Sequence, residues 1–371
     1  MNLPNYKNLD IEHFQHLFDN KSESYKLFWF RAVVDSIMED KLEVSYDELI
    51  NHMIADAWYM VNEYKLNLGP KDTLELLVRH SQGTTGLRSA EKAEKIISAL
   101  SSNSKDKKQL EYKQTLTYNV PYRLQAPLMP YLKGDGWNGS KQALAGRINS
   151  YDALIYSFSK IDGLNSVICI NKDWADYIKA NYYIISGWIE YNMIDYLQRR
   201  NPDVPGISNK LFPPQERNLT KVKKYWKGII ELSNVHEIYS DSLMDTSEIS
   251  IDHFIPWSYV THDELWNLSP TKKSINSSKS NGLPDWDIYF SKLCELEYSA
   301  YVLANSNDAV HALQEDCLKE HINNDEVKQR LYLSRDLSRE QYTNILEGII
   351  HPVYIGAENL GFEKWEQKWA H

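Results

Sequence analysis

The 371-residue chain has few cysteines and no long apolar run. Its three cysteines, Cys169, Cys294 and Cys317, are far apart and never spaced as Cys-x-x-Cys. This pattern argues against a disulfide framework and a cysteine-rich zinc knuckle, and favours reduced thiols in a cytosolic protein. No apolar stretch reaches the roughly 18 residues of a membrane span, and the first residues lack the apolar core of a signal peptide. We therefore expect a soluble, cytoplasmic protein with no membrane contact.

The chain also lacks an overall excess of positive charge, because 41 basic and 51 acidic residues give a net charge of −10. This charge argues against a surface built to coat nucleic acid, although a nuclease needs only a local basic groove. Between residues 199 and 231, eight basic and three acidic residues give a local net charge of +5. A solvated helix face and a phosphate-binding surface both explain such a charge run.

What the chain does contain is mainly helical patterning, without internal repeats or low-complexity segments. Ser45–Glu48 reads as a capping box that starts a helix. Further helices are predicted from Asp173 to about Arg200, from Arg217 to about Leu232, and after Pro284-Asp285. Residues 164–170 are predicted to form a short strand or a buried extended segment. The 25 Tyr and 11 Trp residues fit aromatic packing between helices, with base stacking as the alternative.

One stretch holds a candidate catalytic constellation. Asp252 directly precedes His253, Asn267 follows fourteen residues after that histidine, and Asn276 follows nine residues later. Phosphodiester hydrolysis needs a base for the attacking water and a cation on the scissile phosphate. A histidine with a pKa of about 6.5 suits the first role. One carboxylate and one amide oxygen are sufficient protein ligands for Mg²⁺, which keeps several waters.

The residues around this constellation predict how it is assembled. Residues 248–251 alternate and are β-branched, which predicts a strand, and residues 265–268 are its predicted hairpin partner. Ser269-Pro270-Thr271 resembles a helix start with proline at the first helical position. Such a helix would carry Asn276 back over the hairpin, and Asn267 would brace the connecting loop.

The run from Asp252 to Ser258, followed by residues 263–268, 276–281 and Pro284, resembles the HNH nuclease family with its ββα-metal fold. The intervals are similar to those in the HNH domain of the RNA-guided CRISPR nuclease. The resemblance implies that His253 is the general base and that Asp252 and Asn276 bind Mg²⁺, for which Mn²⁺ can substitute. It also implies that Asn267 orients the loop, that Lys279 lies near the phosphate, and that cleavage leaves 5′-phosphate and 3′-hydroxyl ends.

One departure from the family concerns zinc. Many HNH proteins carry a Cys-x-x-Cys pair just upstream, whereas residues 235–240 here contain no cysteine. We therefore predict no structural zinc and expect the neighbouring helices to hold the module. His236 and His262 have no ligand-spaced partner, and we interpret them as surface residues.

Together these features predict a mainly α protein with an embedded ββα-metal module at about residues 235–284. Residues 1–171 would form a helical region for regulation, recognition or a protein partner, and residues 172–371 a helical region enclosing the module. The expected function is a Mg²⁺-dependent DNA endonuclease of a defence or restriction system. Its expected phosphate contacts are Lys223, Lys224, Lys272, Lys273 and Lys279. An RNA-cleaving nuclease and an inactive adaptor remain alternatives, and a single site per chain leaves a homo-oligomer open.

Overall fold

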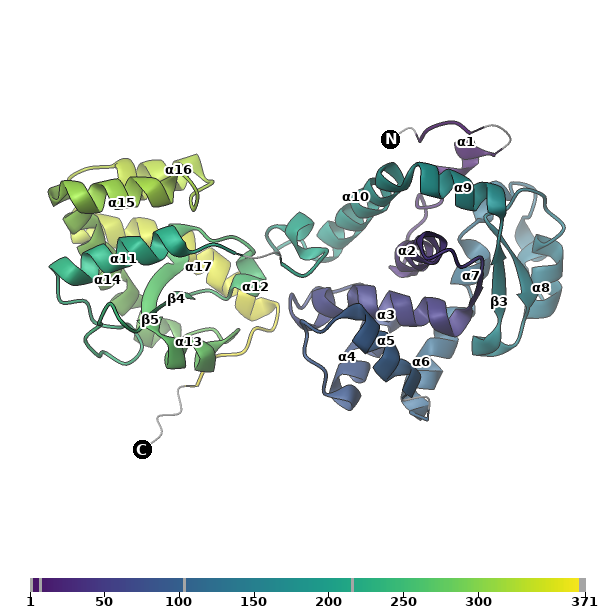
Figure 1. The fold of residues 1–371 in the computed structure, drawn as a ribbon, viewed down its shortest axis with the longest axis horizontal. Helices are drawn as coiled ribbons and strands as arrows, with labels where there is room; N and C mark the ends of the chain where they lie inside the picture. The colour runs from purple at the N-terminus through teal and green to yellow at the C-terminus, as the bar shows by residue number, and fades with distance from the viewer. Residues whose placement is uncertain (1–2, 7–8, 103–104, 215–216, 367–371) are drawn as a thin grey trace. The chain divides into compact units, whose positions relative to one another are not determined.

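The computed structural model describes residues 3–6, 9–102, 105–214 and 217–366, and it confirms a mainly α fold (Figure 1). The chain divides into two compact units. Unit 1 contains Met1–Pro202 with Lys210–Pro213, and unit 2 contains Asp203–Asn209 with Pro214–His371. The division therefore falls near residue 203 rather than after residue 171, because the helices that follow residue 171 pack in unit 1. Within the described ranges, no helix combines the length and the apolar character needed to cross a membrane.

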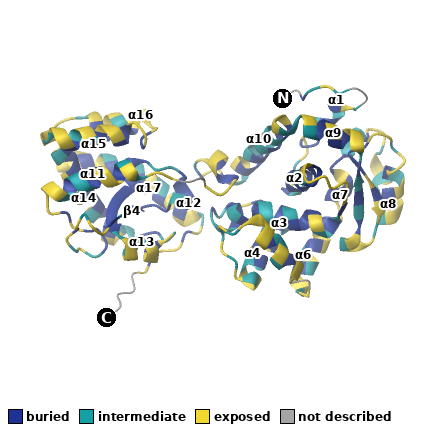
Figure 2. Ribbon diagram, in the orientation of Figure 1, coloured by how far each residue is buried: buried dark blue, intermediate teal, exposed yellow. Residues whose placement is uncertain are grey.

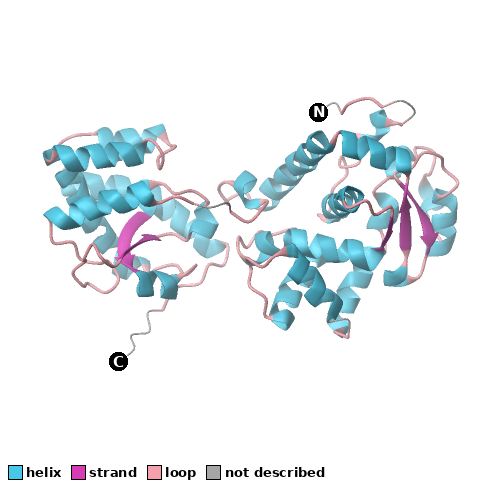
Figure 3. Ribbon diagram, in the orientation of Figure 1, coloured by secondary structure: helices cyan, strands magenta, loops and turns pink. Residues whose placement is uncertain are grey.

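Unit 1 consists of helices with one small sheet (Figure 3). Its helices are α1 (Ile11–Phe14), α2 (Tyr25–Met38), α3 (Tyr46–Asn62), α4 (Thr73–Thr85), α5 (Ala93–Ser102), α6 (Lys107–Thr117), α7 (Val120–Arg123), α8 (Lys141–Ile148), α9 (Lys172–Ala180) and α10 (Tyr182–Arg200). Its strands are β1 (Glu43–Ser45), β2 (Tyr156–Lys160) and β3 (Val167–Ile170), and they pair antiparallel in the order β1-β3-β2. Strand β3 confirms the strand predicted at residues 164–170 for residues 167–170, whereas residues 163–165 form a 3₁₀ turn.

Local sequence signals explain two of these helix ends. The capping box at Ser45 is confirmed, because its side chain accepts from the Glu48 N–H and the Glu48 side chain accepts from the Ser45 N–H. The single helix predicted from Asp173 is wrong. Asn171 caps α9, and α9 ends just before Asn181, after which α10 begins. The Asn181 side chain donates to the Tyr177 carbonyl at 2.9 Å. An asparagine that bonds the backbone in this way competes with helix continuation.

Aromatic side chains fill the core of unit 1. The rings of Phe14, Phe18, Phe30, Trp174 and Trp188 form a chain of contacts with centroid separations from 4.6 to 6.1 Å. Residues coloured as buried lie mainly on the sides of the helices that face other elements of the same unit (Figure 2). For these rings, packing between helices is therefore the interpretation that the structure supports.

Unit 2 is a set of helices around a two-stranded sheet. Its helices are α11 (Thr220–Leu232), α12 (Trp257–Val260), α13 (Lys273–Lys279), α14 (Trp286–Ser306), α15 (Asp308–Leu318), α16 (Asp325–Val327) and α17 (Arg339–Asn359), with a π-helical turn at Lys328–Leu333. Its strands are β4 (Ile249–His253) and β5 (Leu268–Lys272), which pair antiparallel. Asp285 caps α14, as its sequence predicted.

The hairpin partner and the helix start predicted in this region are shifted along the chain. Residues 265–267 form a short 3₁₀ turn, β5 begins at Leu268, and α13 begins only at Lys273. Pro270 lies inside β5 opposite Ile251, not at a helix start. A two-stranded sheet has only edge strands, and proline is tolerated there at positions whose N–H the ladder does not need.

Candidate active site

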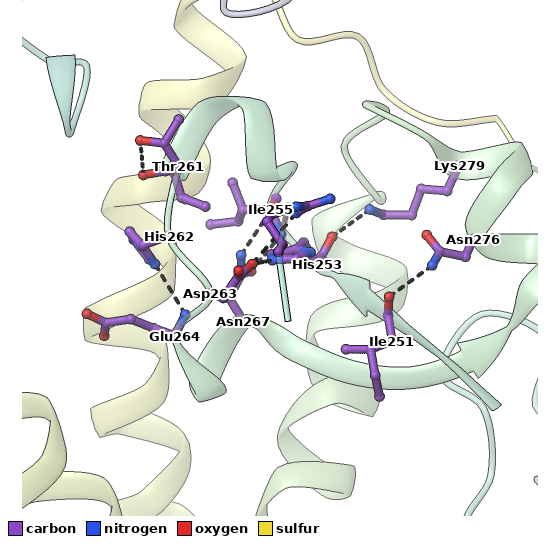
Figure 4. Close-up of polar contacts among 12 residues, drawn as sticks. Ile251, His253, Ile255, Thr261, His262, Asp263, Glu264, Asn267, Asn276 and Lys279 are labelled. Carbon is purple, nitrogen blue, oxygen red and sulfur yellow. Dashed lines mark hydrogen bonds and ion pairs between the residues drawn. The ribbon is translucent and has the colours of Figure 1, made fainter. Parts of the chain in front are cut away.

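The candidate site lies on the β4–β5 hairpin and on the helix that follows it (Figure 4). Asp252 and His253 are the last two residues of β4. Asn276 and Lys279 are three residues apart on α13 and therefore share one helix face. Their side chains donate to the carbonyls of Ile251 and His253, at 2.9 and 2.7 Å. The helix thus lies against the strand that carries Asp252 and His253.

His253 is almost buried and is held by a carboxylate. Its Nε2 lies 2.8 Å from Oδ1 of Asp263, in the loop between α12 and the 3₁₀ turn. Burial lowers the pKa of His253, and the hydrogen bond and charge of Asp263 offset only part of this effect. The imidazole is therefore neutral near pH 7, which is the state that a general base requires.

Asn267 is fully buried and braces the loop that leaves β4. Its Oδ1 accepts from the Ile255 N–H at 2.8 Å, and its Nδ2 donates to the Ile255 carbonyl at 2.9 Å. Its own carbonyl accepts from the Phe254 N–H at 2.9 Å. These bonds fix the backbone of the two residues directly after His253.

Asp252 is buried and both of its carboxylate oxygens have partners. The Tyr239 hydroxyl donates to Oδ2 at 2.6 Å, and the ammonium of Lys279 lies 3.2 Å from each oxygen. Burial, with the Asp252 charge as a second cause, raises the pKa of Tyr239 well above its usual value, so its hydroxyl stays protonated. Burial also lowers the pKa of Lys279, against the opposing effect of Asp252. Because Lys279 is itself buried, its ammonium faces Asp252 rather than solvent.

Asn276 is anchored through its amide nitrogen, which donates to the hydroxyl of Ser250 and the carbonyl of Ile251, both at 2.9 Å. Its amide oxygen makes no hydrogen bond within the described residues, and Figure 4 shows it pointing to the side on which Lys279 lies. Anchoring of the nitrogen thus leaves the amide oxygen available as an acceptor.

The donor types of this site fit a hard divalent cation, which prefers carboxylate and amide oxygens. Asp252 and Asn276 supply one of each, from neighbouring positions on β4 and α13. Within the described part of the chain, no group of three or more His, Cys, Asp or Glu residues is placed to hold a metal. A cation on Asp252 would also require the Lys279 ammonium to move away from the carboxylate.

The predicted lysines fall into two groups. Lys223 of α11, Lys272 of β5 and Lys273 of α13 line a groove of about 840 Å³, together with Ser250 and Ile251 of β4. None of the three has an ion-pair partner among the residues that the structure describes. Lys224 is exposed but lies outside this groove, and Lys279 is buried beside Asp252.

Glu237 holds the segment upstream of β4, where many HNH proteins have cysteines. Its buried carboxylate accepts from the backbone N–H groups of Tyr239 and Ser240, and from the hydroxyls of Ser240 and Thr271. Thr271 belongs to β5, so this side chain ties the upstream loop to the hairpin. His236 is exposed and half-buried His262 packs against Trp266.

Three residues of the site were not singled out by the sequence. Asp263 contacts the histidine, Tyr239 contacts the aspartate, and Glu237 ties the loop to β5. Asp263 lies ten residues after His253, within the stretch that resembles the family, which is the one signal that marks it. Nothing in the spacing of Tyr239 or Glu237 distinguishes them from other residues.

A hairpin followed by a helix, with Asp-His on the first strand and asparagine on the helix, defines a ββα nuclease module. Residues 235–285 match the sequence model of the HNH endonuclease family, so this segment is an HNH endonuclease domain. Its presence indicates nuclease activity and a nucleic-acid substrate. A comparison with curated proteins and one with solved structures found no match.

Proposed function

We propose that this protein is a Mg²⁺-dependent HNH endonuclease that hydrolyses phosphodiester bonds in DNA. The observation that carries the proposal is the arrangement of His253, Asp252 and Asn276 on one hairpin and its following helix, inside the HNH domain. Asn267 braces the chain beside the histidine, so the geometry is set before any substrate arrives.

The residues of the chain divide the reaction between them. Neutral His253 takes a proton from the attacking water, and the buried loop around Asn267 keeps the imidazole in place. Asp252 and Asn276 would hold Mg²⁺, or Mn²⁺ in its place. When bound, such a cation stabilises the negative charge on the phosphate and on the leaving oxygen. Breakage of the bond from phosphorus to the 3′ oxygen leaves 5′-phosphate and 3′-hydroxyl ends.

The lysine-lined groove is the proposed path of the nucleic-acid backbone. Lys223, Lys272 and Lys273 border it, and it shares Ser250 and Ile251 with the strand of the active site. Ser250 and Ile251 are also the residues that bond Asn276, so the groove adjoins the proposed metal ligand. Uncompensated lysines in an acidic protein are suited to bind phosphates locally.

A plasmid assay tests the proposal. Purified protein is incubated with supercoiled DNA and Mg²⁺ or Mn²⁺, beside His253→Ala, Asp252→Ala and Asn276→Ala. We expect nicked product before linear product, because each chain has one site, and we expect each substitution to abolish cleavage. His311→Ala is the matched control, since this half-exposed histidine on α15, outside the HNH domain, should leave the rate unchanged.

The other outcomes discriminate among the alternatives. Cleavage of RNA but not of duplex or single-stranded DNA would replace the DNA substrate with RNA. No cleavage of any nucleic acid would indicate an adaptor that retains only the fold. Cleavage by His253→Ala at the wild-type rate would show that the base is wrongly assigned.

The biological setting that we propose is a defence or restriction system, in which unit 1 recognises a partner or a target. The proposal rests on the pairing of a nuclease domain with a large separate helical unit. Phage plating on cells that express the wild-type protein or His253→Ala tests it. Equal plating on both would remove the defence role without touching the nuclease assignment.

A further inference from the structure

The contact between His253 and Asp263 determines which imidazole nitrogen is the base. Nε2 of His253 lies 2.8 Å from Oδ1 of Asp263. Burial raises the pKa of Asp263, but the hydrogen bond from His253 and the charges of His253 and Arg217 outweigh it, so the pKa lies below its usual value. An ionised carboxylate only accepts hydrogen bonds, so Nε2 must carry the proton. The lone pair of the neutral ring is then on Nδ1, which has no hydrogen-bond partner within the described residues.

We infer that Asp263 is a positioning residue that holds His253 as the Nε2–H tautomer and thereby makes Nδ1 the atom that accepts the water proton. This inference deepens the proposed nuclease function and rests on it. When Nδ1 takes the proton, the hydroxide oxygen bonds to phosphorus and the bond to the 3′ oxygen breaks. The leaving oxygen is protonated by solvent water, and the imidazolium later returns its proton to solvent. Asp263 stays ionised throughout and stabilises the positive ring.

The residues on both sides of Asp263 have a defined backbone conformation or hydrogen bonds. Helix α12 ends at Val260 and is capped by Thr261, whose φ of 54° lies in the left-handed region and turns the chain towards Asp263. Glu264 accepts from the indole N–H of Trp266 at 2.8 Å, and the Leu265 N–H donates to the His321 carbonyl at 3.0 Å. The first bond lies within the same loop, and the second holds the chain that follows Asp263 against the segment at His321.

The alternative is that Asp263 serves only to form an ion pair with Arg217. The Arg217 guanidinium lies 3.7 Å from Oδ1 of Asp263 and stacks over the Trp257 ring at 4.5 Å. The imidazole is nearer, at 2.8 Å, and it is almost buried, whereas Arg217 is exposed. A charge-assisted hydrogen bond of that length is stronger than a looser exposed ion pair. The His253 contact is therefore the main interaction of Asp263, and Arg217→Gln is the variant that removes only the other one.

Nuclear magnetic resonance of protein labelled with ¹⁵N-histidine tests the tautomer without any substrate. Signals that are present in the wild-type spectrum and missing from that of His253→Gln are assigned to the His253 ring. In the wild-type protein we expect a proton on Nε2 that is protected from solvent exchange, and an unprotonated Nδ1. Asp263→Ala should lose that protected proton, whereas Arg217→Gln and the exposed surface control Asp316→Asn should keep it. A wild-type spectrum with the proton on Nδ1 would overturn the inference.

Kinetics provide the second readout. Asp263→Ala should lower kcat by roughly 100-fold, the scale of general-base assistance, with KM almost unchanged. Asp263→Glu should recover part of the loss, and thermal melting should show that both variants fold. Wild-type kcat in Asp263→Ala would refute the positioning role. If the wild-type protein cuts no substrate, the proposed function fails, but the spectra still decide the tautomer.

Discussion

The ammonium of Lys279 lies 3.2 Å from both carboxylate oxygens of Asp252, and both side chains are buried. The same ammonium donates to the carbonyl of His253 at 2.7 Å. In this arrangement a lysine supplies the positive charge that the aspartate needs in a low-dielectric site. A divalent cation and the ammonium cannot both contact Asp252 without strong repulsion. If Asp252 binds the metal as proposed, we expect Lys279 to compete with it, although the sequence position of Lys279 had pointed to the phosphate.

Replacing Lys279 with methionine should strengthen metal binding, because the competing charge is removed. We expect the affinity for Mn²⁺, measured by electron paramagnetic resonance, to rise about tenfold or more, since a repulsion of only about 1.4 kcal/mol has that effect. Without metal, the variant should be less stable by about 3–5 kcal/mol, since Asp252 loses its partner. Added Mn²⁺ should recover the melting temperature.

The exposed Lys319, which pairs with Asp316 at 3.3 Å, is the control for this experiment. Lys319→Met should change neither Mn²⁺ affinity nor melting temperature. Equal Mn²⁺ affinity in the wild-type protein and Lys279→Met would show that the two cations do not compete.

Asn267→Ala should destabilise unit 2, because the N–H and the carbonyl of buried Ile255 would lose their partners. An unsatisfied buried group costs about 1–3 kcal/mol, so we expect a loss of roughly 3 kcal/mol in denaturant unfolding. Asn305→Ala on α14 is the control, since that exposed side chain donates only to the Tyr301 carbonyl and should lose well under 1 kcal/mol. Similar losses in both variants would refute the bracing role.

The acid limb of kcat/KM should lie below pH 6.5, because burial lowers the pKa of His253. Asp263 raises that pKa, so Asp263→Asn should move the limb to still lower pH. A pH–rate profile of both proteins at saturating Mn²⁺ measures this shift. Movement of the limb to higher pH in the variant would contradict the assignment.

The same shift makes folding depend on pH. The folded-state pKa of His253 is below the unfolded value, so the unfolded chain takes up the proton first as the pH falls. The contribution of His253 to stability should therefore decline from about pH 6.5 down to its folded-state pKa. His253→Gln should lose less stability than the wild-type protein between pH 7.5 and pH 5.5. If the free energy of unfolding, measured with denaturant, fell equally in both proteins over this pH range, His253 would not be the source of the pH dependence.

The groove predicts a pattern in the salt dependence of DNA binding. Lys223→Gln, Lys272→Gln and Lys273→Gln, each in the His253→Ala background, should weaken duplex binding and reduce the slope of log affinity against log salt by about one. Lys224→Gln should change the slope less, because Lys224 is exposed outside the groove. Fluorescence anisotropy at several salt concentrations measures these slopes. A Lys224 effect as large as the Lys223 effect would place the DNA elsewhere.

Some of this fold was predictable because its signals are local. The caps at Ser45 and Asp285 act on residues two or three positions away, and both helices begin where predicted. The helix start predicted at Pro270 was wrong because proline is found both in the first turn of a helix and in edge strands. Only the pairing of this segment with β4 decides between the two structures. Asn181 breaks a helix whose apolar pattern continues on both sides.

The site shows the same division between local and distant information. The spacing of Asp252, His253 and Asn276 pointed to the HNH family, and the match of residues 235–285 to that family confirms this prediction. The roles proposed for the three residues remain predictions. The burial of Lys279 could not be predicted, because a lysine near a phosphodiesterase motif is expected to face solvent. The contact of Asp263 with His253 depends on how a ten-residue loop folds back, which no spacing rule describes.

Trp226 of α11 donates its indole N–H to the Leu268 carbonyl at 2.8 Å, and Leu268 is the partner of His253 in the hairpin. On the other side, the Leu283 N–H donates to the Glu363 carbonyl at 2.8 Å, and the Trp365 N–H donates to the Leu283 carbonyl at 2.7 Å. These bonds tie the end of the HNH domain to residues 363–365. The nuclease segment therefore depends on contacts with residues outside it. Transplanted alone into another protein, residues 235–285 would lose both attachments, and any useful transfer must carry α11 and the C-terminal helices along.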